Sequence, residues 1–118
     1  MVTWRRIFGD AGERFAEKEL IRKGYRILAR QYRTPVGEID LIARLGKEII
    51  FVEVKTRRNH VFGYPEEAVT KKKVQSLLSA ASSYLRKNHL EDAPWRLDVV
   101  AIEWGPPVHF EHIEGIGD

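Results

Sequence analysis

The stretch from residue 37 to residue 57, GEIDLIARLGKEIIFVEVKTR, decides the fold of this chain. Two runs rich in branched aliphatic residues, 38–45 and 48–55, lie on either side of Gly46-Lys47. A glycine in the first position of a two-residue loop is typical of a type II′ β-hairpin turn. We therefore predict two antiparallel strands in which the numbers of paired residues sum to 93.

The predicted register gathers charged residues at one end of the hairpin. Asp40 faces Glu53 and Glu38 faces Lys55, with paired Cβ atoms ~5 Å apart. The side chains of the opposite face are all apolar: Ile39, Leu41, Ala43, Leu45, Ile50, Val52 and Val54. Two carboxylates held face to face repel each other, and a divalent cation with oxygen ligands removes that repulsion. Because Mg²⁺ is the usual occupant where phosphate is the substrate, the pattern predicts a magnesium site.

Lys55 lies on the same face as Glu53, because side chains two residues apart on a strand point the same way. An acid that holds a metal, beside a cation that contacts a phosphate or orients a water, is typical of a hydrolytic site. The alternative is an ion-pair cluster on the solvated end of a sheet, since charged residues also gather without any function.

Working outward from the hairpin, the apolar pattern predicts five further elements. They are helices over 10–23 and 65–88 and strands over 25–33, 95–104 and 108–113. Asp10 is expected to cap the first helix and Gly24 to follow its end, while Thr70 caps the long part of the second. The second and third strands lead into a helix and then a fourth strand, so the third and fourth are predicted to be parallel. The result is an α/β fold with a mixed central sheet flanked by helices, in the order α-β-β-β-α-β-β.

Glu13 is a third carboxylate of interest, at the edge of the core-facing stripe of the first helix. A glutamate there is either a further metal ligand or the N3 member of a capping box with Asp10. The spacing alone leaves both interpretations open.

The composition fits one domain over residues 1–118. The chain has no cysteine, which excludes disulfides, thiolate nucleophiles and cysteine-ligated zinc. No apolar run approaches the ~20 residues of a membrane span, and the first residues lack the apolar segment of a secretory signal. We therefore expect a cytoplasmic protein without a membrane partner.

The charge is unevenly distributed. Residues 1–60 carry 14 Lys and Arg against 8 Asp and Glu, whereas residues 61–118 carry 6 against 9. A basic first half suits a polyanionic partner, although a solvated basic face explains it equally well.

Two short basic segments are candidates for contact with nucleic acid. Lys71, Lys72 and Lys73 fall in the first turn of a helix, where the macrodipole disfavours cations but attracts phosphate. Arg57 and Arg58 begin a basic, aromatic loop that suits phosphate contacts or a contact between subunits. We expect all five residues to bind nucleic acid, and ordinary solvated side chains are the alternative.

Three segments resemble a known family: Gly12-Glu13, then GEID over 37–40, then FVEVKTR over 51–57. They look like the signature of the YraN family, small bacterial proteins regarded as endonuclease-like and distantly similar to archaeal Holliday junction resolvases. The resemblance extends from about residue 12 to residue 100. The core pattern of that family is the pattern of the PD-(D/E)xK nucleases, which implies a restriction-endonuclease-like fold.

The resemblance also implies roles for individual residues. Asp40 corresponds to the aspartate of the motif, Glu53 to its acidic residue and Lys55 to its lysine. Glu13 matches the glutamate of the first helix. We expect Asp40 and Glu53 to hold Mg²⁺ or Mn²⁺, with Glu13 bound directly or through water, while Lys55 orients the attacking water or contacts the phosphate.

The expected function is therefore metal-dependent hydrolysis of phosphodiester bonds in DNA, including branched or junction DNA. A homodimer is expected because two sites related by a twofold axis cut two strands most simply. The alternatives are a nucleic-acid-binding module of the same fold without useful turnover, and a protein-interaction domain.

Overall fold

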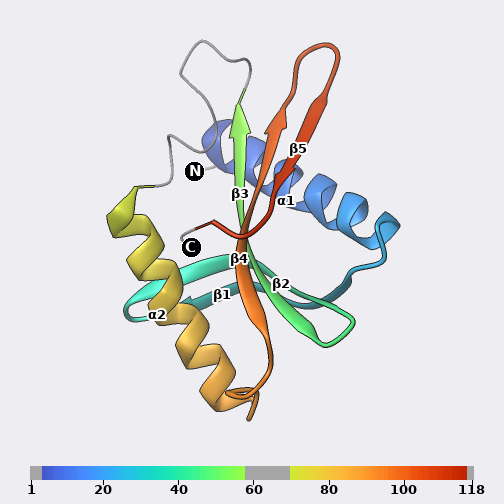
Figure 1. Cartoon of the computed structure of the whole chain (residues 1–118). Helices are drawn as coiled ribbons and strands as arrows, with labels where there is room; N and C mark the ends of the chain where they lie inside the picture. The colour runs from blue at the N-terminus through green and yellow to red at the C-terminus, as the bar shows by residue number, and fades with distance from the viewer. Residues whose placement is uncertain (1–3, 58–69, 117–118) are drawn as a thin grey trace.

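The structure of the chain, a computed structural model, describes residues 4–57 and 70–116. The helices are α1 (Trp4–Arg22) and α2 (Lys71–Lys87). The strands are β1 (Arg26–Thr34), β2 (Gly37–Leu45), β3 (Glu48–Arg57), β4 (Trp95–Glu103) and β5 (His109–Ile113). The predicted α/β fold and the predicted order of its elements are confirmed (Figure 1).

The five strands form one mixed sheet in the order β1-β2-β3-β4-β5. β3 and β4 are parallel, as predicted, and every other neighbouring pair is antiparallel. In the β2–β3 hairpin the paired residue numbers sum to 93 from Leu45↔Glu48 to Leu41↔Val52, and Gly46 has a φ of 61°. The predicted loop and register are therefore confirmed over this length of the hairpin.

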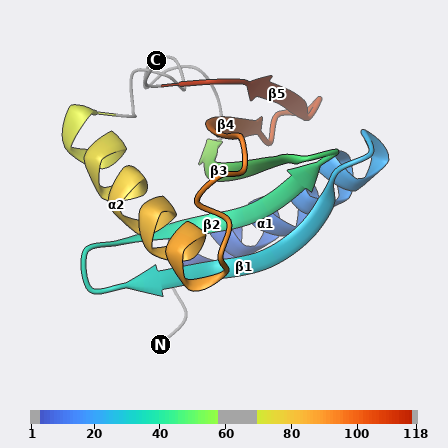
Figure 2. The ribbon, with the colours of Figure 1, turned by 60° about the horizontal axis from the view of Figure 1, so that its bottom comes forward.

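The two helices cover opposite faces of the sheet. On one face, α2 contributes Leu77 to a buried cluster that includes Ile42 and Phe51. On the other face, α1 contributes Leu20 to a buried cluster that includes Val52. Figure 2 shows α2 on one side of the long β1–β2 hairpin and α1 on the other. Side chains near the ends of these helices can therefore approach the same part of β2 and β3.

The start of α1 differs from the prediction. The helix begins at Trp4 rather than at Asp10, so Asp10 lies inside it and does not cap it. The capping-box interpretation of Glu13 is therefore wrong, because a capping box requires its first member at the helix boundary. The predicted end of the helix is confirmed: Gly24 has a φ of 96°, and the Tyr25 amide donates to the Leu20 carbonyl at 3.0 Å, as in a Schellman motif.

The start of α2 agrees with the prediction from Thr70 onward. Thr70 is the N-cap, and its hydroxyl accepts a hydrogen bond from the Lys73 amide at 3.2 Å. The predicted helical residues 65–69 lie outside the part of the chain that the structure describes. Within the described residues, neither helix has the length and apolar character that a membrane crossing requires.

Two glycines allow both helices to approach the sheet closely. A Cβ on Gly12 of α1 would lie 2.0 Å from the Thr56 Cγ2 atom on β3. A Cβ on Gly37 of β2 would lie 2.5 Å from the carbonyl oxygen of Ser76 on α2. A larger residue at Gly12 would clash with the Thr56 side chain, and one at Gly37 would clash with the backbone of α2. The two glycines therefore allow Glu13 of α1 and the first turn of α2 to lie near the charged end of the hairpin.

Candidate metal centre

The ladder between β2 and β3 ends next to the predicted site. The last recorded backbone pair is Leu41↔Val52, one residue short of Asp40 and Glu53. Beyond it, the Val54 amide donates a hydrogen bond at 2.8 Å to Oδ2 of Asp40. In an uninterrupted ladder a backbone carbonyl of β2 would accept from this amide. The Asp40 carboxylate accepts in its place, so the carboxyl group lies between the two strands.

The alternation of side chains along β2 reverses at Asp40. Leu41 packs in the cluster on the α1 face, whereas both Ile42 and Ile39 pack in the cluster on the α2 face. The prediction that Ile39 shares a face with Leu41 is therefore wrong. The reason lies partly in β1, where Gln31 has a φ of 47° between the pairs Arg30↔Leu41 and Tyr32↔Ile39.

The charged end of the hairpin differs from the prediction in one further respect. Glu38 is exposed and forms an ion pair at 3.5 Å with Arg33 on β1. The backbone pairing of β2 with β3 ends before it reaches Glu38 and Lys55. Glu38 therefore belongs to the rim of the site and not to its centre.

Asp40 and Glu53 lie close enough for a hydrogen bond between their carboxyl groups. Burial, reinforced by the bond to Glu53 and by its negative charge, raises the pKa of Asp40 to about 8, although the Val54 amide opposes this. At neutral pH the pair therefore holds a proton in place of a second negative charge. A cation bound between the two groups would replace that proton.

Glu53 is the buried member of the pair, with 4% of its surface exposed. Its Oε2 atom lies 3.2 Å from Nζ of Lys73 and 3.7 Å from Nζ of Lys55. Neither lysine completes a hydrogen bond to this oxygen, so Oε2 is a buried acceptor without a hydrogen-bond partner among the described residues. Such an atom is costly to bury, and it offers a free oxygen ligand that fits a divalent cation.

Glu13 reaches the same region from α1. Burial raises its pKa, a hydrogen bond from the Gln31 side chain lowers it, and the charges of Asp10, Glu38 and Glu53 raise it again. The influence of Glu53 shows that the three carboxylates share one electrostatic environment. The three carboxylates do not form a preformed cage. In the described part of the chain, their oxygen atoms do not all lie within 4.8 Å of one another.

A cleft with a volume of about 740 Å³ opens between α1 and the β1–β2 hairpin. Glu13, Gln31 and Asp40 line it, and Arg30 and Arg33 lie on its wall. Arg30 is paired with Glu17 and Arg33 with Glu38, and Arg14 offsets one of the remaining acids. Asp10 and Glu13 still outnumber Arg14 when Asp40 is protonated, so the cleft is weakly negative. The volume is in the range of small-molecule sites, and the charge suits a cation.

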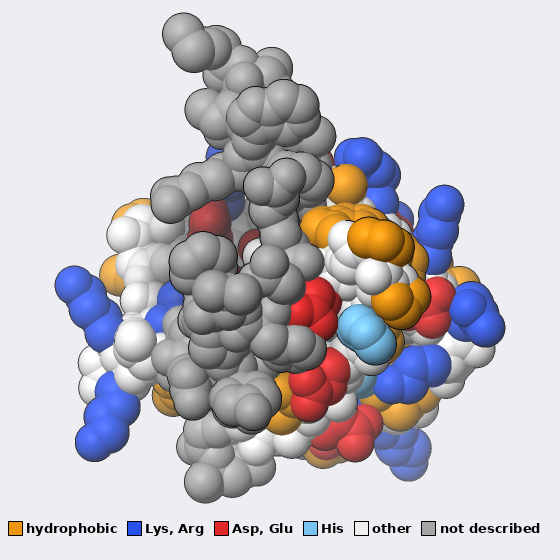
Figure 3. All heavy atoms as spheres, turned by 90° about the horizontal axis from the view of Figure 1, so that it is seen from above, with side chains coloured by type: hydrophobic (Ala, Val, Ile, Leu, Met, Phe, Trp, Pro, Cys, Tyr) orange, Lys and Arg blue, Asp and Glu red, His pale blue; other side chains and the backbone are white. Residues whose placement is uncertain are grey.

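Figure 3 shows the end of the molecule toward which β3 and β4 run. Among the coloured side chains, several acidic ones lie inward of the Lys and Arg side chains, which are mostly at the margin of this face.

The predicted basic residues occupy different places. Lys73 reaches Glu53, whereas Lys71 and Lys72 are exposed at the start of α2. Arg57 is described, but Arg58 lies outside the described residues.

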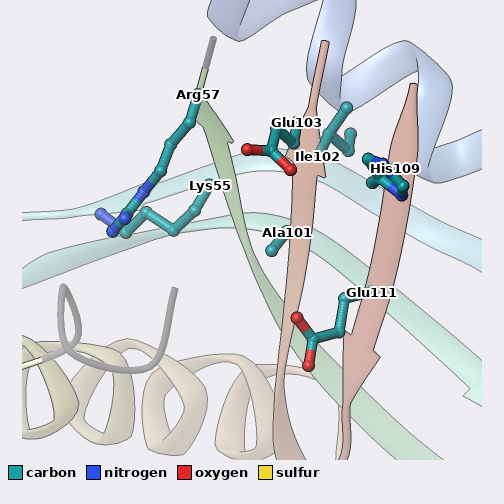
Figure 4. A pocket seen from close by; sticks show the side chains of 7 residues that line it. All are labelled: Lys55, Arg57, Ala101, Ile102, Glu103, His109 and Glu111. Carbon is teal, nitrogen blue, oxygen red and sulfur yellow. The ribbon is translucent and has the colours of Figure 1, made fainter. Parts of the chain in front are cut away.

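A small hollow lies next to Lys55 on the other side of β3. Figure 4 shows Lys55 and Arg57 extending side by side from β3, with Glu103 beside them on β4 and His109 and Glu111 on β5. Its volume of about 30 Å³ is that of a water molecule rather than a nucleotide. Lys55, on the central strand, lines this hollow, whereas Glu13 and Asp40 line the larger cleft, which is the candidate site.

A second charged cluster surrounds Asp98 of β4, which is fully buried. Its oxygens accept hydrogen bonds from Arg96 at 2.9 and 3.2 Å, from His112 at 2.7 Å and from the Gly115 amide at 3.0 Å. Burial would raise the pKa of Asp98, but these bonds outweigh it and lower the pKa. The Lys23 ammonium donates to Nδ1 of His112 at 2.6 Å, so Nε2 carries the proton that His112 donates to Asp98.

Among the described residues, Asp98, His112 and Glu114 are the one trio whose ligand atoms lie within 4.8 Å of one another. Arg96 nevertheless bonds to both Asp98 and Glu114, and it also bonds to Glu48 at 2.6 Å and to the Tyr25 hydroxyl at 2.8 Å. Every oxygen of Asp98 is already satisfied, so this cluster fastens the ends of α1, β4 and β5 rather than holding a cation. The sequence analysis did not find it, because its members lie far apart along the chain.

Comparison with known proteins gives one consistent result. A family profile described as "Uncharacterised protein family UPF0102" matches residues 12–102. A UPF0102 protein of Clostridioides difficile (strain 630) is 49% identical over 94 residues, covering 80% of this chain and 82% of that protein. A UPF0102 protein of Symbiobacterium thermophilum is 51% identical over 98 residues, covering 83% of each. A UPF0102 protein of Syntrophotalea carbinolica is 44% identical over 119 residues, covering 99% of this chain and 97% of that protein.

Proposed function

The chain belongs to the UPF0102 family, which is also named YraN, and we propose that it is a metal-dependent nuclease that hydrolyses phosphodiester bonds in DNA. One observation carries the proposal: Oε2 of Glu53, which lies next to Asp40, is a buried acceptor without a hydrogen-bond partner among the described residues. A purely structural ion-pair cluster would satisfy its acceptors, as the Asp98 cluster does. Two carboxyl groups that retain a proton at neutral pH instead form a site ready to exchange it for a cation.

Asp40 and Glu53 are the residues that would hold Mg²⁺ or Mn²⁺, since both present carboxylate oxygens to one point. A bound ion of this kind supplies Lewis-acid stabilisation of a phosphoryl oxygen and lowers the pKa of a coordinated water. Glu13 faces the same point from α1 and lies too far to complete a tight cage. Its role is to receive a hydrogen bond from a water within the cleft.

Lys55 and Lys73 neutralise Glu53 from two different elements, β3 and the first turn of α2. When Glu53 binds a cation, the attraction between its carboxylate and each lysine decreases. Both ammonium groups then become available to a phosphate that approaches the site. Lys55 is the closer candidate for orienting a water or contacting the scissile phosphate, because it lies on the same strand as Glu53.

Lys71 and Lys72 are exposed one turn before Leu77 anchors α2 to the sheet, and we assign them to contacts with the DNA backbone. Their removal should weaken binding at all sequences and reduce the slope of log affinity against log salt by about 0.9 for each lost phosphate contact. An unchanged slope for Lys71→Ala with Lys72→Ala would remove them from the interface. The expected homodimer remains a prediction, and sedimentation of dilute protein would measure it.

The test of the function is cleavage of labelled linear, branched and single-stranded DNA with Mg²⁺ or Mn²⁺. Asp40→Asn should abolish cleavage, because an amide binds a hard cation far more weakly than a carboxylate does. Asp92→Asn is the matched control: it makes the same chemical change at an exposed aspartate in the turn before β4. Equal activity in wild type and Asp40→Asn would identify a contaminating nuclease.

A wild type that binds DNA but cleaves none of these substrates would instead favour the binding module of nuclease fold. The specific observation on that side is the lack of a preformed three-carboxylate cage around Asp40 among the described residues.

A further inference from the structure

Lys73 reaches the carboxyl pair from the first turn of α2. The Thr70 hydroxyl accepts a hydrogen bond from its backbone amide at 3.2 Å, which fixes the start of the helix. Its Nζ atom lies 3.2 Å from Oε2 of Glu53, whereas the neighbouring Lys71 and Lys72 are exposed. The helix dipole disfavours a cation in a first turn, so the attraction of a buried carboxylate accounts for the place of this ammonium.

The Glu53 oxygen has two ammonium groups beside it and accepts a hydrogen bond from neither. Nζ of Lys55 lies 3.7 Å from Oε2, farther away than Nζ of Lys73. Oε2 is buried and lacks a hydrogen-bond partner among the described residues. The lysines therefore supply positive charge without satisfying the acceptor, and a ligand that binds the oxygen directly would replace them with a gain.

A divalent cation and Lys73 compete for this oxygen. Mg²⁺ lies about 2.0–2.1 Å from its oxygen ligands, so an ion on Oε2 would be within about 5 Å of Nζ of Lys73 in its present place. In a buried site, like charges at this separation repel each other strongly. Lys73 is the nearer of the two lysines, and its side chain is 34% exposed, so it can turn away.

A phosphate is the partner that fits the displaced ammonium. Lys71 and Lys72 are exposed in the same turn, and together with Lys73 they offer three positive charges to a polyanion. A phosphate bound there would return to Lys73 the attraction that it loses at Glu53. The cation and the phosphate thus relieve each other's cost.

We propose that Lys73 holds the place of the cation at Glu53 and moves to a substrate phosphate when the cation binds. This inference rests on the proposed function and adds to it an order of events. Without DNA, Lys73 opposes the cation. With DNA, the cation and the phosphate backbone each raise the affinity of the other by the same factor, because coupling between two ligands is reciprocal.

Titration calorimetry with Mn²⁺ alone tests the competition. Lys73→Gln should bind Mn²⁺ about tenfold more tightly than the wild type, because the competing charge is gone and coupled sites typically differ by about 5–150-fold. Lys73→Arg keeps the charge and should bind Mn²⁺ as weakly as the wild type does. Lys87→Gln is the matched control, since it makes the same change at an exposed lysine in the last turn of α2 and should leave the affinity unchanged.

Fluorescence anisotropy with a labelled oligonucleotide tests the coupling to phosphate. The probe is titrated in chelator and again with Ca²⁺, a hard cation that also takes carboxylate oxygens as ligands. Ca²⁺ should raise the DNA affinity of the wild type and of Lys87→Gln, and it should raise that of Lys73→Gln about tenfold less. An equal rise in all three proteins would overturn the coupling.

The outcomes separate this inference from the proposed function. If the wild type binds Mn²⁺ and Lys73→Gln binds it equally or more weakly, the competition is overturned and the nuclease stands. If neither protein binds Mn²⁺, the competition and the proposed metal centre both fail. Binding of Mn²⁺ by Lys73→Gln alone would support the competition in its strongest form.

Discussion

The described residues include two clusters built around a buried carboxylate, Asp98 in one and Glu53 in the other, and they differ in how far their oxygens are satisfied. Asp98 receives four hydrogen bonds from three residues, and its pKa is lowered. Asp40 shares a hydrogen bond with another acid, Glu53, and its pKa is raised to about 8. The first cluster is complete as it stands. In the second, two lysines lie near Glu53, yet its Oε2 atom has no hydrogen-bond partner among the described residues. The comparison teaches that carboxylates whose ligand atoms lie close together can already have every oxygen satisfied, as Asp98 has, whereas Glu53 keeps a buried acceptor without a hydrogen-bond partner among the described residues.

The largest expected difference between the clusters is in stability. Asp98→Asn should lower the free energy of unfolding by about 3–5 kcal/mol, because an amide cannot accept the four hydrogen bonds of the carboxylate and Arg96 loses its buried acidic partner. Folding lowers the pKa of Asp98 from 3.8, so its ionised carboxylate adds to the free energy of unfolding at any pH above 3.8. This stabilisation is lost as the pH falls through the lowered pKa of the folded protein. Urea denaturation measures the change. A loss smaller than 1 kcal/mol would remove the distinction between the two clusters.

The opposite pH dependence is expected at the other cluster. The pKa of Asp40 is raised from 3.8 to about 8, so between these values the folded protein holds a proton that the unfolded chain has released. Stability therefore falls as the pH rises through this window, by at most about 1.4 kcal/mol for each pH unit.

Asp40→Asn should abolish this decline and be more stable than wild type at pH 7, because an amide needs no proton and still accepts from the Val54 amide. Denaturant unfolding at pH 5 and pH 8 compares the two proteins. If Asp40→Asn is strongly destabilised at both values, Asp40 is a structural ion-pair partner and the two clusters are alike.

A smaller effect is expected from the cation itself. At a concentration of 100 times its Kd, Mg²⁺ should stabilise the wild type by about 2.7 kcal/mol, since it binds the folded state alone. Asp92→Asn should show the same increase, and Asp40→Asn should show none. Thermal unfolding with Mg²⁺ and with added chelator provides the measurement, and stabilisation that persists in Asp40→Asn would place the ion elsewhere.

The sequence predicted much of the fold, because the signals were local. Gly46-Lys47 determined the hairpin register, and the crossover from β3 to β4 determined their parallel pairing. The predicted start of α1 was wrong. Asp10 is a residue type that often caps helices, but the helix already begins at Trp4.

The candidate site was predictable in its residues but not in its geometry. Alternation brings Asp40 near Glu53, yet the reversal of faces at Asp40 depends on Gln31, and glutamine carries no sequence signal for positive φ. The ion pair between Lys73 and Glu53 depends on where α2 packs, which Gly37 permits through its contact with Ser76. Such contacts between distant segments leave no periodic pattern in the chain.

The most direct test of the central claim is a titration of ¹⁵N-labelled protein with Mn²⁺, because this paramagnetic ion broadens the signals of the amides closest to it. The account predicts that the amides of Asp40, Glu53 and Val54 broaden first, at less than one equivalent, while those of Asp98 and His112 remain sharp. Broadening that begins at Asp98 and His112, with Asp40 and Glu53 unaffected, would contradict the account.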